Sequence, residues 1–232
     1  MGKFPISLCT FVKNEATTVI EMLESAVPIV SDIVVVDTGS TDNTVDICKR
    51  YTNRVYQIPF SDFGSIRTIT AHLASMPWVL MLDADERIVA EDYGKFAELI
   101  NQKVGTATAN YERDSSGEVV IDSWALPRKR WADLWMRKQL ELESWPDWQV
   151  RLFRNHPDRR IKFVRRVHET VEGCIRTEHS IDGPVIHHFQ GVGKNNERAK
   201  ERQHLYTSLY EADIEDGIHH SEPPIVSIDK VE

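Results

Sequence analysis

The chain has 232 residues, of which 41% are hydrophobic and 28% charged, and its formal net charge is −8. This composition is typical of a globular protein, and the acidic balance argues against a protein that coats nucleic acid, because neutralising phosphates requires an excess of Lys and Arg. No stretch resembles a signal peptide or reaches the roughly 18 apolar residues of a membrane span, so we expect a cytoplasmic protein. The odd number of cysteines, three, argues against a disulfide framework, and the absence of a C-x-x-C pair argues against a structural zinc site.

The first half of the chain alternates apolar strands with amphipathic helices. Strands are expected at Ile6–Phe11, Ile33–Val36, Val55–Ile58 and Trp78–Leu82. Thr18 and Glu21 form a capping box at the start of the first helix, and further helices are expected near Asp42, around Ile66 and over residues 91–101. Repeated strand–helix–strand units imply right-handed crossovers and a mostly parallel twisted sheet.

Polar residues follow three of these strands, in the segments Lys13–Glu15, Asp37–Asp42 and Asp83–Glu86. Ligands of parallel sheets bind at the carboxyl ends of the strands, so we expect these segments to meet along one rim. Asp83 and Asp85 form a D-x-D pair whose hard oxygens suit Mg²⁺ or Mn²⁺, and such an ion would hold the phosphates of a nucleotide. For an isolated D-x-D, a solvated acidic turn is the alternative.

The second half has shorter apolar segments and an unusual charge. We expect a hairpin over 106–122, strands at 149–153, 161–164 and 185–189, and a helix over 194–216 with an apolar stripe that includes Leu205 and Leu209. From Arg128 to Arg166 there are 12 Lys and Arg against 5 Asp and Glu, and five of the six Trp fall between residues 124 and 148. This pattern indicates either a basic surface with core tryptophans or a binding face for an anionic or lipid-linked partner.

Several of these segments resemble the family-2 glycosyltransferases of the GT-A fold. The resemblance rests on TFVKNE (10–15), VVVDTGSTDNT (34–44), Arg67 and WVLMLDADE (78–86). Three later segments are similar to the subgroup related to lipopolysaccharide-core glucosyltransferases: WPDWQVRLFR (145–154), VHE (167–169) and IHHF (186–189). The family often has Arg-Asn where this chain has Arg67 followed by Thr68.

The resemblance implies a fold and a domain organisation. The fold is α/β, a GT-A (Rossmann-like) mostly parallel central sheet with helices on both faces and a smaller antiparallel acceptor-side portion. One glycosyltransferase domain would span residues 1–216, with a nucleotide-sugar-binding half at about 1–103, an acceptor half at about 104–193 and a C-terminal helix at 194–216. Residues 217–232 are expected to form a flexible tail.

The resemblance also implies residue roles. Asp147 stands where the family usually has its catalytic base, and Asp83 and Asp85 would bind the metal. The residues expected at the nucleotide are Thr10, Lys13, Asn14, Glu15, Asp37, Ser40, Arg67 and Asp83.

Histidines and strand arginines leave alternatives open. His168 is a candidate third metal ligand or diphosphate contact, and the alternative is a partly buried histidine bonded to the backbone. His187 and His188 alternate faces in a strand, so at most one should point into the site. Arg151 and Arg154 could bind phosphate, but solvated strand arginines are the commoner outcome.

Together these features predict an inverting, metal-dependent transfer of a sugar from a nucleotide-diphosphate donor, a UDP-hexose, with Mn²⁺ or Mg²⁺ as cofactor. The expected acceptor is a hydroxyl of a glycan, glycolipid, lipopolysaccharide core or peptide, with no nucleic-acid partner. We expect a cytoplasmic location with peripheral contact at the inner face of the membrane. The alternatives are a non-catalytic nucleotide-sugar-binding module and a phosphatase that uses the first Asp of the D-x-D as nucleophile.

Overall fold

A computed structural model describes residues 2–102, 121–140, 145–157, 161–174, 176–189 and 196–218. The strands are β1 (Phe4–Val12), β2 (Val30–Asp37), β3 (Val55–Gln57), β4 (Trp78–Met81), β5 (Glu86–Arg87), β6 (Ser123–Arg130), β7 (Asp147–Arg154), β8 (Lys162–Val164), β9 (Thr170–Glu172), β10 (Thr177–His179) and β11 (Ile186–His188). The helices are α1 (Val19–Ala26), α2 (Thr44–Cys48), α3 (Phe63–His72), α4 (Tyr93–Asn101) and α5 (Asn196–Glu215), with a short 3₁₀ turn at Ala90–Asp92.

Nine strands form one mixed sheet in the order β3-β2-β1-β4-β7-β6-β11-β5, with β10 also paired to β6. β1 pairs in parallel with β2 and β4, and β2 pairs in parallel with β3. β7 runs antiparallel to both β4 and β6, and β8 and β9 form a separate antiparallel pair. The predicted α/β sheet with a smaller antiparallel portion is confirmed. The carboxyl ends of β2, β1 and β4 therefore lie side by side.

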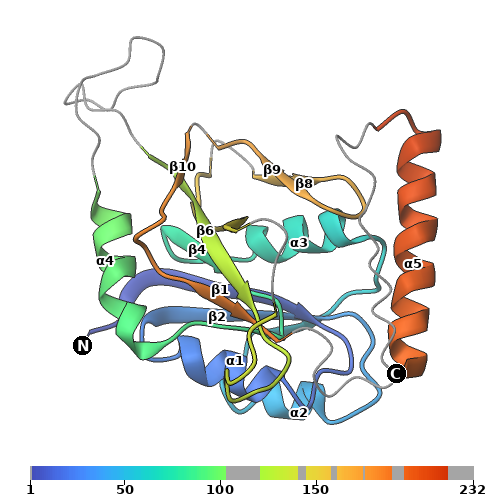
Figure 1. Cartoon of the computed structure of the whole chain (residues 1–232), viewed down its shortest axis with the longest axis horizontal. Helices are drawn as coiled ribbons and strands as arrows, with labels where there is room; N and C mark the ends of the chain where they lie inside the picture. Colours follow the sequence, from blue (N-terminus) through green and yellow to red (C-terminus); the bar gives the residue numbers. More distant parts are fainter. Residues whose placement is uncertain are drawn as a thin grey trace.

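Both faces of the sheet are covered, because consecutive residues of β1 bury their side chains on opposite sides. Leu8 belongs to a core cluster that includes Leu23 of α1 and Phe96 of α4. Cys9 belongs to a second cluster that includes Ala71 of α3. Figure 1 shows this arrangement, with α1 and α2 on one face and α3 on the other. The continuous β-branched run of β2 is buried on both faces for the same reason.

The first helix begins differently from the sequence prediction. The Thr18 side chain makes no capping hydrogen bond to the helix, and Glu21 does not complete a capping box. The Thr18 hydroxyl instead donates to a carboxylate oxygen of Glu15 at 2.8 Å. The Glu15 carboxylate, in the turn before the helix, therefore accepts the hydroxyl that the predicted capping box would have used.

α5 confirms the predicted C-terminal helix, but Leu205 of the expected apolar stripe is exposed. Leu205 is 37% exposed, so it does not form a buried stripe. Tyr206 packs against Phe63 at a ring distance of 5.0 Å, and the buried Asp213 accepts the backbone N–H of Arg166 at 2.9 Å. Nη1 of Arg166 also lies 3.3 Å from Oδ1 of Asp213, so the helix is attached through an aromatic contact, a hydrogen bond and an ion pair. The hairpin predicted over 106–122 lies almost wholly outside the described residues, as does the predicted tail after Ile218.

Candidate active site

The loops after β1 and β2 are bonded to each other. Asn14 adopts a left-handed conformation with φ of 55°, which Asn tolerates better than most residues. Its side-chain oxygen accepts the backbone N–H of Thr41 at 2.6 Å, and its own N–H donates to the Ser40 hydroxyl at 2.8 Å. The N–H of Glu15 donates to the Thr44 hydroxyl at 2.7 Å. Two of the predicted nucleotide-binding segments are thus held together at one rim.

Asp37 is buried at the end of β2 and shapes the turn that follows. Its carboxylate accepts the backbone N–H groups of Gly39 and Ser40, each at 3.2 Å. Gly39 has a φ of 105°, a conformation that favours glycine. Thr10 is fully buried and its hydroxyl has no hydrogen-bond partner among the residues described, whereas Lys13 is exposed. Direct contact of these residues with a nucleotide stays a prediction.

Asp83 follows β4 and is held by two arginines. Its two carboxylate oxygens lie 2.9 Å from Nη1 of Arg67 and 2.8 Å from Nη2 of Arg151. Burial alone raises the pKa of Asp83, but the charges of Arg67 and Arg151 lower it well below its ordinary value. Arg151 is only 4% exposed, so the expectation of a solvated strand arginine was wrong.

Arg67 is fixed on several sides. It lies over the rings of Phe11 and Phe163, with its guanidinium carbon 5.1 and 5.7 Å from their centroids. Its Nε is 3.5 Å from a carboxylate oxygen of Glu169, which adjoins the predicted ligand His168. Arg67 thus contacts Asp83 in this structure, and its expected contact with the base or the diphosphate stays a prediction.

Glu86 is a buried member of the site that the sequence analysis did not single out. Its side chain is fully buried, and one carboxylate oxygen lies 2.7 Å from Arg151 and 3.4 Å from Arg128. The other oxygen accepts the backbone N–H of Asp83 at 3.1 Å. No local sequence pattern marks Glu86 for this role, because its partner Arg151 lies 65 positions further along the chain.

Asp147 lies at the start of β7 between two arginines. Its Oδ2 is 2.8 Å from Nη2 of Arg128 and 3.4 Å from Nη2 of Arg130, and its Oδ1 accepts from Gln149 at 2.8 Å. Burial alone raises the pKa of Asp147, but Arg128 and the bond from Gln149 lower it below its ordinary value. Because Arg128 also contacts Glu86, a continuous network joins the D-x-D to Asp147. We call the residues Asp83, Glu86, Arg128, Asp147 and Arg151 the charge network.

The two adjacent histidines of β11 have different environments, as their alternation predicted. His188 places Nε2 3.6 Å from Oδ1 of Asp85, and its Nδ1 is buried without a hydrogen-bond partner in the described part of the chain. His187 stacks on Trp131, and its Nδ1 accepts the indole N–H at 2.9 Å. His188 is therefore the histidine beside the D-x-D.

His168 is exposed and lies near Tyr206 of α5, at a ring distance of 6.1 Å. Within the described ranges, no group of three or more His, Cys, Asp or Glu side chains is arranged to hold a metal ion. The proposed set of Asp83, Asp85 and His168 thus stays a prediction.

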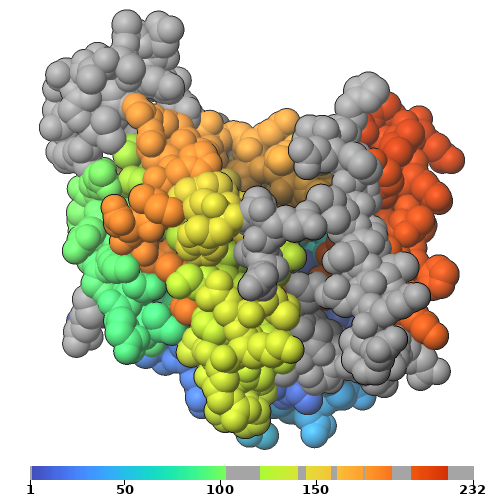
Figure 2. All heavy atoms as spheres, viewed as in Figure 1, coloured from blue at the N-terminus to red at the C-terminus, as the bar shows by residue number. Residues whose placement is uncertain are grey.

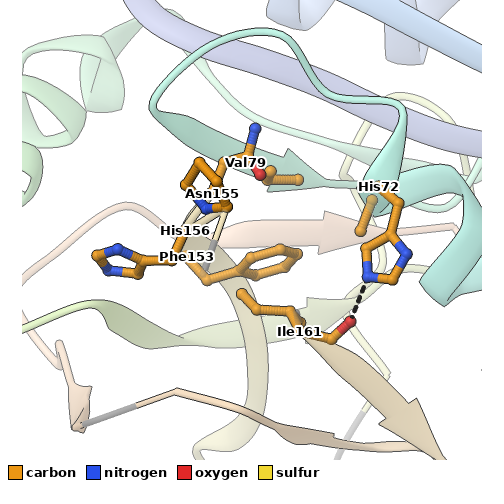
Figure 3. Close-up of a pocket in the computed structure, with 8 residues that line it drawn as sticks. His72, Val79, Phe153, Asn155, His156 and Ile161 are labelled. Carbon is orange, nitrogen blue, oxygen red and sulfur yellow. Dashed lines mark hydrogen bonds between the residues drawn. The ribbon is translucent and has the colours of Figure 1, made fainter. Parts of the chain in front are cut away.

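A pocket with a volume of 320 Å³ lies at the opposite, amino-terminal end of β4. It is lined by residues that include Val79, Phe153 and Ile161, with His72 and His156 at its edge (Figure 3). Nε2 of His72 is 2.8 Å from the Ile161 carbonyl oxygen. Because Asp83 follows the other end of β4, this pocket is separate from the charge network.

A protein-family model that covers most of the central sheet identifies the family of the chain. The family model for glycosyl transferase family 2 matches residues 7–154, from β1 to the end of β7. The chain belongs to glycosyl transferase family 2. The family assignment confirms the resemblance on which the predicted residue roles were based.

Two curated relatives of the chain are longer than the chain itself. The TPR repeat-containing protein Synpcc7942_0270 of Synechococcus elongatus is 28% identical over 201 residues, which are 82% of this chain and 43% of that protein. The uncharacterized glycosyltransferase RC0292 of Rickettsia conorii is 34% identical over 86 residues, which are 37% of this chain and 30% of that protein. The chain thus spans less than half the length of these curated relatives.

Solved structures confirm the fold expected of a family-2 member. Residues 1–349 of S. aureus TarS in complex with UDP-GlcNAc superpose with a TM-score of 0.56 at 17% identity, covering 80% of this chain and 58% of that one. The complex of the same protein with UDP gives a TM-score of 0.56 and covers 79% and 60%. At this identity the likeness concerns the fold. Among the described residues of this family-2 chain, no helix is long and apolar enough to cross a membrane.

Proposed function

We propose that this chain is an inverting, metal-dependent glycosyltransferase that moves a sugar from a nucleotide-diphosphate donor, a UDP-hexose, to a hydroxyl of an acceptor such as a glycolipid or a lipopolysaccharide core. The observation that carries the proposal is the charge network, which connects the D-x-D after β4 with Asp147 on β7. TarS, which has the same fold, has been solved with UDP and with UDP-GlcNAc, and this supports a uridine nucleotide as donor. In this proposal residues 1–103 bind the donor, about 104–193 receive the acceptor, and the reaction takes place in the cytoplasm.

The donor atoms beside the D-x-D suit a divalent cation. Asp85 offers a carboxylate and His188 an imidazole nitrogen 3.6 Å from it, a combination of ligands that Mn²⁺ accepts. Nε2 of His188 faces Asp85 and is therefore the imidazole nitrogen that would bind the cation. We therefore assign Asp85 and His188 as the residues that would hold it, with Asp83 beside them. When bound, the cation stabilises the negative charge that grows on the leaving diphosphate.

Asp147 is the proposed base. A carboxylate oxygen accepts two hydrogen bonds, so an acceptor hydroxyl can donate to Oδ1 beside Gln149. The arginines that lower its pKa keep Asp147 ionised at neutral pH and fix its orientation. Its proton affinity is low as a consequence, so the transfer relies on alignment of the hydroxyl more than on basicity. The arginine-clamped Asp83 is held on both oxygens, which supports a transferase over a phosphatase with Asp83 as nucleophile.

The donor site is tested by calorimetric titration of the full chain with UDP, with and without Mn²⁺. We expect binding that requires Mn²⁺ and is lost in Asp85→Asn. Asp46→Asn is the matched control, because Asp46 is exposed on α2. Equal UDP binding by Asp85→Asn and the wild type, or no nucleotide binding by the wild type, would contradict the proposal.

The base is tested with the nucleotide sugar that binds most tightly. We expect Asp147→Asn to bind this donor as the wild type does and to release UDP about 10² to 10⁴ times more slowly. Asp182→Asn, in an exposed turn, serves as the control. A wild-type rate of UDP release in Asp147→Asn would remove Asp147 from the mechanism.

A further inference from the structure

The loop after β6, residues 131–140, carries apolar side chains into solvent. Trp135 is 71% exposed and Met136 is 36% exposed. In Figure 2 the yellow-green atoms of this part of the chain form a projection on the lower front of the molecule. Large apolar side chains that gather on a projecting loop are typical of a contact surface.

The backbone of this loop is closed by hydrogen bonds. Trp131 bridges to Gln139, and the N–H of Ala132 donates to the Lys138 carbonyl at 3.0 Å. The Asp133 carboxylate accepts the N–H of Trp135 at 2.9 Å and that of Lys138 at 2.8 Å. The loop is thus built to hold its tip in one conformation, and the exposure of Trp135 follows from that conformation.

The body of the protein also holds this loop. Nη1 of Arg87 in β5 donates to the Leu134 carbonyl at 3.3 Å, and the N–H of Trp131 donates to the His188 carbonyl at 2.8 Å. The tip is therefore presented at a fixed place relative to the sheet.

Basic side chains accompany the exposed tryptophans, although the chain as a whole is acidic with a net charge of −8. The guanidinium of Arg137 lies over the Trp135 ring at 4.8 Å, and Lys138 beside it is exposed. Trp145 is 48% exposed and has the Lys129 ammonium 5.5 Å from its ring. Tryptophan next to Lys and Arg is the combination found where proteins meet the headgroup region of an anionic bilayer.

Consecutive residues of β6 have contacts on different faces of the strand. Arg128 and Arg130 point to the face that carries Asp147, as their ion pairs show. Lys129 lies between them and so points to the other face, where it meets Trp145.

We propose that the tip of the 131–140 loop, with Trp135 and Met136 beside Arg137 and Lys138, forms a surface that binds the headgroup region of a bilayer rich in anionic phospholipid. In this proposal, the surface makes the peripheral membrane contact that the sequence predicts. It goes beyond the proposed transferase activity and does not depend on it, because the binding needs neither donor nor metal.

The test is cosedimentation of the full chain with vesicles of pure phosphatidylcholine and of phosphatidylcholine mixed with phosphatidylglycerol, without nucleotide. We expect binding to the anionic vesicles that high salt weakens. Trp135→Ala should weaken it about tenfold. Arg137→Gln with Lys138→Gln should weaken it about 25-fold, since each basic residue near an anionic surface contributes about fivefold.

Ile214→Ala is the matched control, because Ile214 is 55% exposed on α5, and it should bind vesicles as the wild type does. UDP binding by the Trp135 variant, measured in parallel, reports whether the donor site and the fold are intact. Absence of vesicle binding by the wild type, equal binding to both vesicle types, or full binding by the Trp135 and Arg137/Lys138 variants overturns the proposal. A loss of turnover on a soluble acceptor in Trp135→Ala, without vesicle binding by the wild type, assigns the surface to the acceptor instead.

Discussion

Neighbouring arginines lower the pKa of carboxylates both in the candidate site and far from it. Asp83 and Asp147 have lowered pKa values because arginines adjoin them. Asp32 in β2, at the other end of the sheet, also has a lowered pKa and an arginine beside it. Its Oδ2 lies 2.5 Å from Nη1 of Arg54 and accepts from the hydroxyls of Ser7 and Ser75 at 2.7 and 2.8 Å. Asp32 is a structural residue, and its bonds connect β1, β2 and the segment before β4.

The stability that Asp32 contributes should depend on pH. Burial raises its pKa, but the bonds from Arg54, Ser7 and Ser75 lower it below the ordinary value. A lowered folded-state pKa means that the stabilisation is complete above the unfolded-state pKa of about 3.9 and is lost as pH falls through the folded-state value. We expect Asp32→Asn to lower the free energy of unfolding by about 1 to 3 kcal/mol at pH 7. Urea unfolding should show this difference shrinking below about pH 4.

The control for this prediction is Asp46→Asn on the exposed face of α2, which should match the wild type at both pH values. A difference between Asp32→Asn and the wild type that persists unchanged at low pH would show that the ionised carboxylate is not its source.

At the scale of elements, α3 lies unusually close to the segment after β8. A Cβ on Gly64 would lie 2.3 Å from the Arg165 carbonyl oxygen and 2.7 Å from that of Phe163. The N–H of Phe163 donates to the Thr68 hydroxyl at 2.8 Å, so the helix and the strand are also hydrogen-bonded. Thr68, where the family often has Asn, therefore has a structural partner here.

Gly64→Ala should force α3 away from β8. Because the obstructing atoms are backbone carbonyls that cannot rotate aside, we expect the free energy of unfolding to fall by about 1 to 3 kcal/mol. Since α3 also carries Arg67, the variant should weaken UDP binding as well. Gly2→Ala, whose Cβ would have no neighbour within 4 Å, is the control for thermal and urea unfolding. An unchanged melting temperature in Gly64→Ala would contradict the close approach.

The first half of the sheet could be predicted from the sequence because its signals are local. The β-branched run of β2, the apolar run of β4 and the polar turns after them identify each strand and the rim at which they meet. The charge network was only partly predictable, because its bonds join residues far apart in the chain. Glu86 and Arg151 are 65 positions apart, and no local rule makes a buried Glu the partner of a strand Arg. The prediction of a capping box at Thr18 was wrong for a related reason, since the Glu15 carboxylate accepts the hydrogen bond of the Thr18 hydroxyl.

For the molecule as a whole, the charge network is the link between the predicted donor and acceptor halves. Glu86 lies in the first half, and its partners Arg128 and Arg151 lie in β6 and β7 of the second. Removing one member of a buried ion pair leaves an uncompensated charge and commonly costs about 3 to 5 kcal/mol. Replacing both members with apolar residues of similar volume is often close to neutral for stability.

Single and double variants of Glu86 and Arg151 can therefore distinguish a role of this ion pair in stability from a role in positioning the site. We expect Glu86→Leu alone to be strongly destabilised, and Glu86→Leu with Arg151→Met to recover much of the free energy of unfolding. The double variant should still be inactive when the release of UDP from the nucleotide sugar is measured. In this variant Asp83 lacks its contact with Arg151, and Arg128 lacks its contact with Glu86. Glu21→Leu is the control, because Glu21 is 39% exposed and its contact with Arg87 is 3.9 Å long. A double variant that is both stable and fully active would show that the pair does not position the site, whereas a stable and inactive one assigns it that role.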